Sequence, residues 1–139
     1  MPPAYDPQNI FAKILRGEMP CARVFEDDVA LAFMDIMPRA EGHTLVIPKA
    51  PARGLLDMPA DALGPYMVRV QKVAAAVKRA MAADGLTIQQ FNESAGGQVV
   101  FHLHFHILPR WDGVTQNPPG TMGDKAAREA NAAKIRAAF

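Results

Sequence analysis

The sequence contains a single cysteine, Cys21, which excludes an internal disulfide and a metal site built from several thiolates. No apolar run approaches the roughly 18 residues that a bilayer-spanning helix needs. The amino terminus also lacks the basic segment followed by an apolar stretch that is typical of a secretory leader. These absences predict a protein of the reducing cytoplasm with no membrane partner.

An excess of charge of one sign is also missing. The chain has 15 basic and 14 acidic residues, mixed along its length, and a formal net charge of +1 at pH 7. Proteins that follow a nucleic-acid backbone concentrate lysine and arginine on one surface. We therefore expect no nucleic-acid partner, and any nucleotide that the protein binds should be a small molecule.

The length and the apolar periodicity predict one domain of mixed structure. At 139 residues and 50% hydrophobic composition, the chain can bury one core but is too short for two. A long helix is predicted from Leu63 to Met81, where apolar residues recur at spacings of three and four, with Gly85 as its C-terminal stop. Other patterns predict a short helix, a hairpin and three further strands at residues 9–15, 23–25 with 30–34, 43–48, 86–92 and 99–109.

This order of elements favours an α+β fold. We expect an antiparallel sheet of about five strands with the long helix packed across it. Residues 111–123 are irregular and proline-rich, whereas residues 124–139 are rich enough in alanine to form a helix. The prediction is one domain over 1–139, with a core at about 6–110 and a partly helical C-terminal extension at 111–139.

Three of the four histidines alternate in the run His102-Leu103-His104-Phe105-His106-Ile107-Leu108. Because a strand has a period of two, the imidazoles would share one face while Leu103, Phe105 and Ile107 face the core. Alternating polar residues are common on a half-exposed strand, but three of four histidines in one run favour a functional site. The preceding Gly96-Gly97-Gln98 can bring backbone N–H groups close to an anion, which indicates phosphate chemistry.

Two kinds of chemistry suit this histidine run. Histidines two apart can share a metal ion, but same-face residues lie about 6.6 Å apart along a strand, and His43 is the only other histidine. A neutral imidazole can instead attack phosphorus and carry the transferred group. His104 is the predicted nucleophile because it alone has an imidazole neighbour on either side. No metal and no cofactor are predicted.

At these residues the chain resembles the histidine triad family, whose signature is His-x-His-x-His followed by two apolar residues. The resemblance extends over most of the chain, including residues 10–14, 31–36 and 42–49, and is strongest to the Hint branch of nucleotide-binding proteins and nucleoside phosphoramidate hydrolases. It implies a homodimer. It also implies that His104 takes up a nucleoside monophosphate, that His102 and His106 support it, and that His43 is a fourth active-site histidine.

The resemblance assigns a nucleotide site as well. Asp35 would accept hydrogen bonds from the ribose hydroxyls, a role that suits an ionised carboxylate. Without the resemblance, Asp35 is a turn residue and His43 is equally well a surface residue at a strand end. The remaining implied nucleotide-binding residues are the apolar walls Ile10, Phe11, Phe33 and Ile36 and the loop residues Asn92, Gly97, Gln98 and Val99.

The sequence departs from the family pattern at Asn9, Ala12 and Val99. Asn9 and Ala12 occupy the places of a Cys-x-x-Cys pair that helps to hold a structural zinc in some members, so no zinc is predicted. Val99 replaces a serine that, in close Hint relatives, can hydrogen-bond the phosphate or the leaving group.

The predicted activity is hydrolysis of purine nucleoside 5′-phosphoramidates or related adenylates through a nucleotidyl-histidine intermediate. Three alternatives stay open: a dinucleoside polyphosphate hydrolase with the same nucleophile, a nucleotide-sensing or partner-binding protein with little catalysis, and a metallohydrolase.

Overall fold

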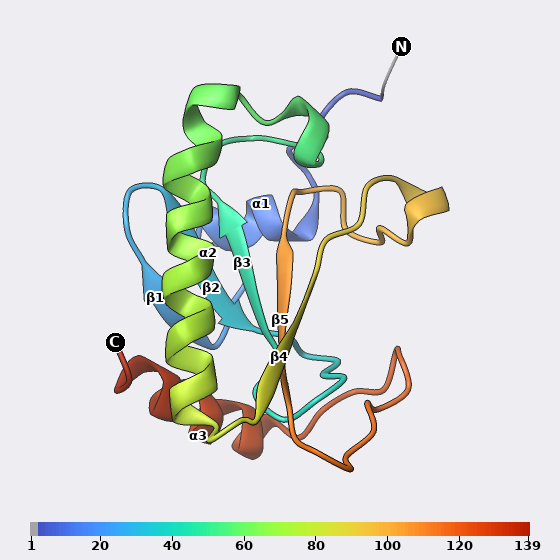
Figure 1. Cartoon of the computed structure of the whole chain (residues 1–139). Coiled ribbons are helices and arrows are strands. Elements are labelled where there is room, and N and C mark those ends of the chain that lie inside the picture. The colour runs from blue at the N-terminus through green and yellow to red at the C-terminus, as the bar shows by residue number, and fades with distance from the viewer. Residues whose placement is uncertain (1–2) are drawn as a thin grey trace.

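The computed structural model describes residues 3–139 and contains one five-stranded antiparallel sheet with the strand order β1-β2-β3-β5-β4 (Figure 1). The strands are β1 (Arg23–Glu26), β2 (Ala30–Met34), β3 (Thr44–Pro48), β4 (Gly85–Gln89) and β5 (Phe105–Arg110). The helices are α1 (Ile10–Leu15), α2 (Ala60–Ala80) and α3 (Lys125–Arg136), with short 3-10 turns η1 (Leu55–Asp57) and η2 (Ser94–Gly96). The predicted α+β class is confirmed.

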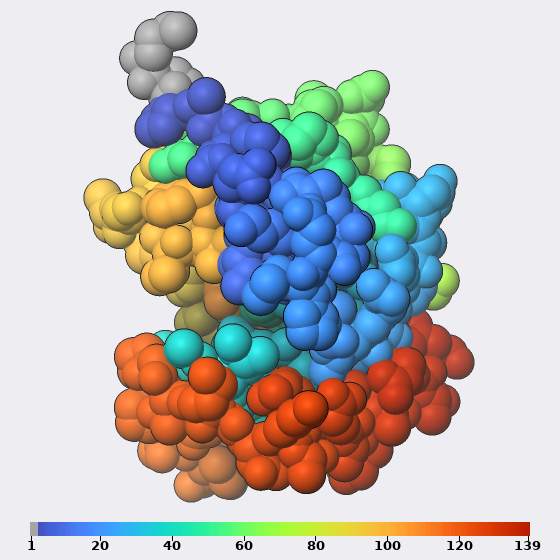
Figure 2. Space-filling model, turned by 180° about the vertical axis from the view of Figure 1, so that it is seen from behind, coloured from blue at the N-terminus to red at the C-terminus, as the bar shows by residue number. Residues whose placement is uncertain are grey.

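Both faces of the central strands are covered, so β2 and β3 are buried along their whole length. Alternate residues divide between two apolar clusters because a strand has a period of two. Ala32 and Val46 belong to the cluster under α2, whereas Leu31 and Ile47 pack with Phe11 of α1 on the opposite face. Figure 2 shows α1 and the N-terminal segment covering the upper part of that opposite face.

Helix α2 lies along the sheet (Figure 1) and buries one apolar stripe against it. Val70, Val73 and Val77 form this stripe together with Tyr66, whose side chain is fully buried. The Tyr66 hydroxyl donates a hydrogen bond of 2.7 Å to the Val46 carbonyl and so satisfies the one polar atom that the stripe buries.

The C-terminal helix is part of the main core. Asp124 caps α3 by accepting a hydrogen bond from the Ala127 amide at 2.8 Å. Ala132 and Ile135 are fully buried in the same cluster as the stripe of α2. The predicted C-terminal helix is therefore present, while the division into 6–110 and 111–139 stays a prediction. Within residues 3–139, no helix is long and apolar enough to cross a bilayer.

Three predicted boundaries are wrong. Gly85 opens β4 instead of ending α2, and β4 stops at Gln89, which leaves Asn92 in a loop. The predicted strand 99–109 is paired only from Phe105 onwards. The ladder with β3 stops at the pair of Val46 and Phe105, and the chain before it bonds elsewhere: the Leu103 amide donates to the Ala52 carbonyl and the His102 imidazole to the Pro48 carbonyl.

Helix α2 ends in a Schellman arrangement with Ala82 in the left-handed conformation (φ 48°). The Ala82 amide bonds the Arg79 carbonyl and the Ala83 amide bonds the Lys78 carbonyl, which satisfies two carbonyls of the last turn. Glycine usually fills this position because a Cβ is strained there.

We expect Ala82→Gly to raise the free energy of unfolding by about 0.5–1 kcal/mol, because the relief of strain exceeds the added entropy of the unfolded chain. Ala75→Gly, at an exposed position in the middle of α2, should lower it by about 1 kcal/mol. Urea unfolding of the two variants measures both values, and equal effects of the same sign would contradict this account of the helix end.

Candidate active site

Only His106 of the histidine run belongs to a regular strand, β5. His102 and His104 precede it in irregular chain. The predicted two-sided arrangement nevertheless exists, because Leu103 and Ile107 are fully buried in the cluster under α2. His106 pairs with Leu45, whose side chain packs on the α1 face of the sheet.

His104 is held in one tautomer by the backbone carbonyl of His102. Its Nδ1 lies 2.6 Å from the carbonyl oxygen of His102. Since a carbonyl can only accept, Nδ1 carries the proton and Nε2 of the neutral ring carries a lone pair. Burial lowers the pKa of His104, which favours this neutral form. The ring therefore has the protonation that an attacking imidazole requires.

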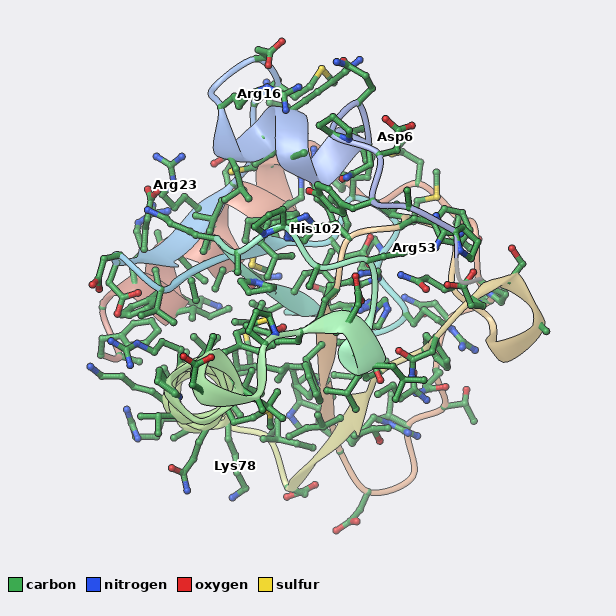
Figure 3. The ribbon with its side chains drawn as sticks, turned by 90° about the horizontal axis from the view of Figure 1, so that it is seen from above. Asp6, Arg16, Arg23, Arg53, Lys78 and His102 are labelled. Atoms are coloured by element: carbon green, nitrogen blue, oxygen red, sulfur yellow. The ribbon has the colours of Figure 1, made fainter. Side chains whose placement is uncertain are left out.

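His102 uses both of its ring nitrogens inside the protein. Its Nε2 donates to the Pro48 carbonyl at 2.8 Å, and its Nδ1 accepts from the Tyr5 hydroxyl at 2.6 Å. The side chain is fully buried, and this burial lowers its pKa to about 4. Figure 3 shows His102 in the interior of the molecule. A ring with both nitrogens engaged can support its neighbours but has no nitrogen left for a ligand.

His43 and His106 form a chain of hydrogen bonds with one direction. The backbone amide of Arg39 donates to Nδ1 of His43 at 3.0 Å, so the proton of neutral His43 sits on Nε2. That Nε2 lies 3.0 Å from Nδ1 of His106, which must accept and therefore leaves Nε2 of His106 as an N–H donor. Burial lowers the pKa of His43 to about 4 and that of His106 to about 3. The result is a neutral donor beside His104, whose ring centroid is 4.9 Å from that of His106.

Asp35 lies at the other end of this chain. One of its carboxylate oxygens is 3.4 Å from Nε2 of His43, longer than a normal hydrogen bond, and the other accepts from the Met37 amide at 2.8 Å. Burial raises the pKa of the Asp35 carboxyl. Asp35, His43 and His106 are close enough to share a metal ion. However, the Arg39 amide keeps the His43 proton on Nε2, where a metal would need a lone pair, so the hydrogen-bond network disfavours an ion there.

The predicted apolar wall divides into two parts. Phe11 and Phe33 are buried in the core under α1, and the Phe11 ring packs edge-on against His104 at 5.0 Å. Ile10 and Ile36 are exposed, at 41% and 47%. Of the four, the two isoleucines have exposed apolar surface, whereas Phe11 contacts the His104 ring and Phe33 packs behind Phe11.

The loop before the histidine run is held together by its own amides. Gln98 is buried, and its side chain bonds the carbonyls of Arg53 and Val100 and the amide of Glu93. The Asn92 carboxamide oxygen accepts from the Leu55 amide at 2.8 Å. These two side chains shape the loop.

Gly97 and Val99 lie nearer the surface of this loop. Gly97 has a positive φ of 98°, which strains any other residue, and a Cβ there would also press on the Phe91 ring at 3.3 Å. Val99 is 83% exposed. Its aliphatic side chain has no hydrogen-bonding group to offer a leaving group.

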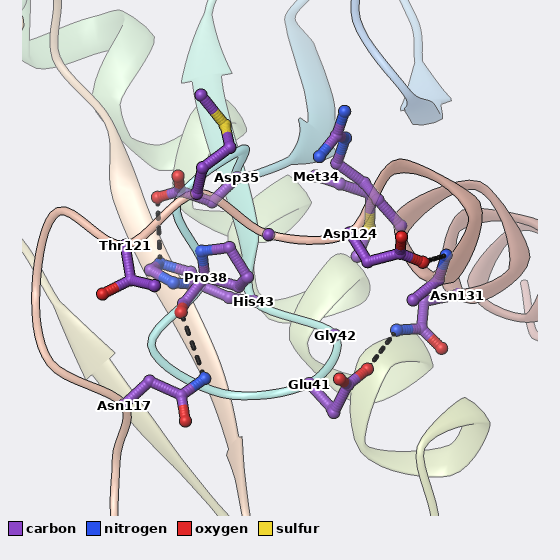
Figure 4. A pocket seen from close by; sticks show the side chains of 14 residues that line it. Met34, Asp35, Pro38, Glu41, Gly42, His43, Asn117, Thr121, Asp124 and Asn131 are labelled. Atoms are coloured by element: carbon purple, nitrogen blue, oxygen red, sulfur yellow. Dashed lines mark hydrogen bonds and ion pairs between the residues drawn. The ribbon is translucent and has the colours of Figure 1, made fainter.

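A pocket of about 120 Å³ lies beside Asp35 and His43 (Figure 4). Its opposite wall comes from the C-terminal segment, where the Asn117 side chain donates to the Pro38 carbonyl and the Asn131 side chain donates to Glu41. The sequence had not assigned this segment to the site.

Sequence reasoning also missed the groups that orient the histidines, namely Tyr5, the Pro48 carbonyl and the Arg39 amide. No pattern could have revealed them, because Tyr5 and His102 are 97 positions apart and the other two are backbone groups.

A five-stranded α+β fold with a buried cluster of four neutral histidines places the protein in a known class. The sequence pattern of the HIT domain matches residues 16–113, and the chain belongs to this family. A crystal structure of a HIT-like protein involved in cell-cycle regulation from Bartonella henselae superposes with a TM-score of 0.94 at 55% identity, covering 99% of this chain and 100% of that one.

Curated relatives include proteins with named activities. An uncharacterized HIT-like protein of Methanocaldococcus jannaschii is 44% identical over 75% of this chain and 80% of its own length. The adenylylsulfatase HINT3 of Arabidopsis thaliana is 38% identical over 73% of this chain and 51% of its own. The adenosine 5′-monophosphoramidase HNT1 of Saccharomyces cerevisiae is 35% identical over 80% of this chain and 68% of its own.

The lowered pKa values predict that acid destabilises the fold well above pH 4. The unfolded state gains protons on histidine below about pH 6.5, whereas folded His43 and His102 gain them only near 4 and His106 near 3. Stability should therefore fall as pH drops from about 6.5 towards 4, with a limiting slope of about 1.4 kcal/mol per pH unit for each histidine that stays neutral in the folded state, and the lowered pKa of His104 adds to this, less an opposing effect of Asp35.

Urea unfolding at a series of pH values measures this slope. His43→Gln removes one of the four buried rings whose pKa is lowered and should make the slope shallower. If the free energy of unfolding stays constant between pH 7 and about 5, the buried rings gain protons in the folded state as readily as in the unfolded state, and this prediction is wrong.

Proposed function

We propose that the protein is a nucleotide-binding hydrolase that cleaves purine nucleoside 5′-phosphoramidates or related adenylates. The observation that carries the proposal is the hydrogen bond from Nδ1 of His104 to the His102 carbonyl, because it leaves Nε2 as a lone-pair donor inside a protected site. The adenylylsulfatase and phosphoramidase activities named for two relatives support the choice of substrate class.

The reaction has two displacements at phosphorus. In the first, Nε2 of His104 forms a bond to phosphorus as the bond to the leaving group breaks, and the leaving group departs with the electron pair, an amine taking a proton from solvent. In the second, water attacks phosphorus, loses a proton and releases the nucleoside monophosphate and neutral His104. Nε2–H of His106 would donate to a phosphate oxygen throughout and stabilise its growing charge.

The other residues would bind the nucleotide. Asp35 would accept from the ribose hydroxyls, and the exposed side chains of Ile10 and Ile36 would contact the base. His43 would hold His106 in its donor tautomer. The loop with Gly97, Gln98 and Val99 would approach the phosphate. The reaction as written needs no metal, and homodimer formation and a cytoplasmic location stay predictions.

We expect His104→Ala to reduce the turnover of adenosine 5′-phosphoramidate by at least about 10³-fold, because the nucleophile is lost. Binding of AMP, measured by calorimetry, should persist because Asp35 and the base contacts are intact. Lys134→Ala, on the exposed side of α3, serves as a control with unchanged turnover.

Mass spectrometry of quenched wild-type protein should show a nucleotidyl adduct on His104. Unchanged turnover in His104→Ala would exclude the proposed nucleophile. Tight AMP binding by the wild type with neither adduct nor product would favour the nucleotide sensor instead.

Val99 is exposed, and its side chain cannot donate a proton to a departing amine. A second measurement therefore compares substrates with different leaving groups. Initial rates on adenosine 5′-phosphoramidate and on a diadenosine polyphosphate separate the proposed hydrolase from the polyphosphate hydrolase. We expect the phosphoramidate to be the better substrate for the wild type and Val99→Ser to raise its rate. A higher rate on the polyphosphate would support the alternative enzyme.

A further inference from the structure

Tyr5 lies in the segment that leads into α1, and its hydroxyl reaches the Nδ1 of His102 at 2.6 Å. The two rings pack edge-on with their centroids 5.5 Å apart. We propose that Tyr5 is a positioning residue, whose hydroxyl fixes the ring of His102 and, through the backbone of His102, the reactive tautomer of His104. The inference rests on the proposed function, in which His104 is the nucleophile.

The first step of the argument is the proton count at His102. The Pro48 carbonyl can only accept, so Nε2 of His102 must donate and Nδ1 must accept. The side chain is fully buried, which excludes bulk water from Nδ1. The Tyr5 hydroxyl is the donor that this nitrogen needs, because a buried acceptor without a partner is costly.

The second step links the ring of His102 to its carbonyl. The backbone of this segment is held by the Leu103 amide, which donates to the Ala52 carbonyl at 2.8 Å. The side chain is held at both nitrogens, by Tyr5 and Pro48. With both fixed, the His102 carbonyl stays directed at Nδ1 of His104, 2.6 Å away. If the ring of His102 turns, this carbonyl moves and the proton of His104 is free to shift to Nε2.

The third step is that Tyr5 is itself anchored. The segment after it is held against α1 by hydrogen bonds from Arg16 to the Pro7 carbonyl and from the Asn9 amide to the Asp6 carbonyl. Asn9 also caps α1 by accepting from the Ala12 amide at 2.9 Å. The same residues that begin the helix therefore deliver the Tyr5 hydroxyl to the interior.

The test is Tyr5→Phe, which keeps the ring and removes only the hydroxyl. We expect kcat for adenosine 5′-phosphoramidate to fall about 10- to 100-fold with little change in KM, because the nucleophile is misplaced while the nucleotide contacts remain. Nitrogen-15 spectra of the imidazoles should show His104 as a single Nδ1–H tautomer in the wild type and as a mixture in Tyr5→Phe.

Tyr66→Phe is the matched control, since Tyr66 is the other tyrosine of the chain and its buried hydroxyl bonds the Val46 carbonyl within the apolar cluster under α2, where it contacts no histidine ring nitrogen. It should lower stability but leave kcat and the His104 tautomer unchanged. In the wild type, a through-bond correlation between the Tyr5 hydroxyl proton and Nδ1 of His102 reports the contact without any substitution.

The proposal is overturned if Tyr5→Phe keeps both kcat and the single His104 tautomer, or if the wild type lacks the correlation. The spectra do not depend on turnover. An inactive wild type with the expected tautomers would therefore contradict the proposed function alone, and an active Tyr5→Phe with the wild-type tautomer would contradict the positioning role alone.

Discussion

The site depends on one constraint, the burial of four neutral imidazoles. A neutral ring has one nitrogen that donates and one that accepts, so each ring needs neighbours of matching type. The main chain supplies most of them, through the carbonyls of Pro48 and His102 and the amide of Arg39. Because these groups act in one direction only, the path of the backbone determines where the protons lie.

The sheet keeps this polar cluster apart from the main core. Its α2 face is closed by the apolar side chains of α2 and α3, which include Val73 and Ile135. The other face carries α1, and Phe11 of this helix packs against both Phe33 and His104. One face of the histidine run, with Leu103 and Ile107, therefore packs in the apolar cluster under α2. The other face carries the imidazoles with their ring contacts and hydrogen bonds.

The C-terminal segment connects the main core to the site. The Asn117 amide donates to the Arg39 carbonyl at 2.7 Å, and the Gly123 amide donates to the Ile36 carbonyl at 2.9 Å. The loop that they hold contains the Arg39 amide that orients His43. The C-terminal segment therefore affects His106 indirectly. It holds the loop whose Arg39 amide orients His43, and His43 in turn donates a hydrogen bond to His106.

The sequence by itself determined the α+β class, the position of every helix and strand to within a few residues except at β5, and the two faces of the histidine run, because these follow from local periodicity. Only the tertiary structure decided that β5 begins at Phe105 and which nitrogen carries the proton in the rings of His43, His102 and His106. Several of those outcomes depend on partners far along the chain, such as Tyr5 with His102 and His43 with His106. Backbone donors and acceptors are the same at nearly every residue, so no residue pattern can indicate which of them a buried imidazole will meet.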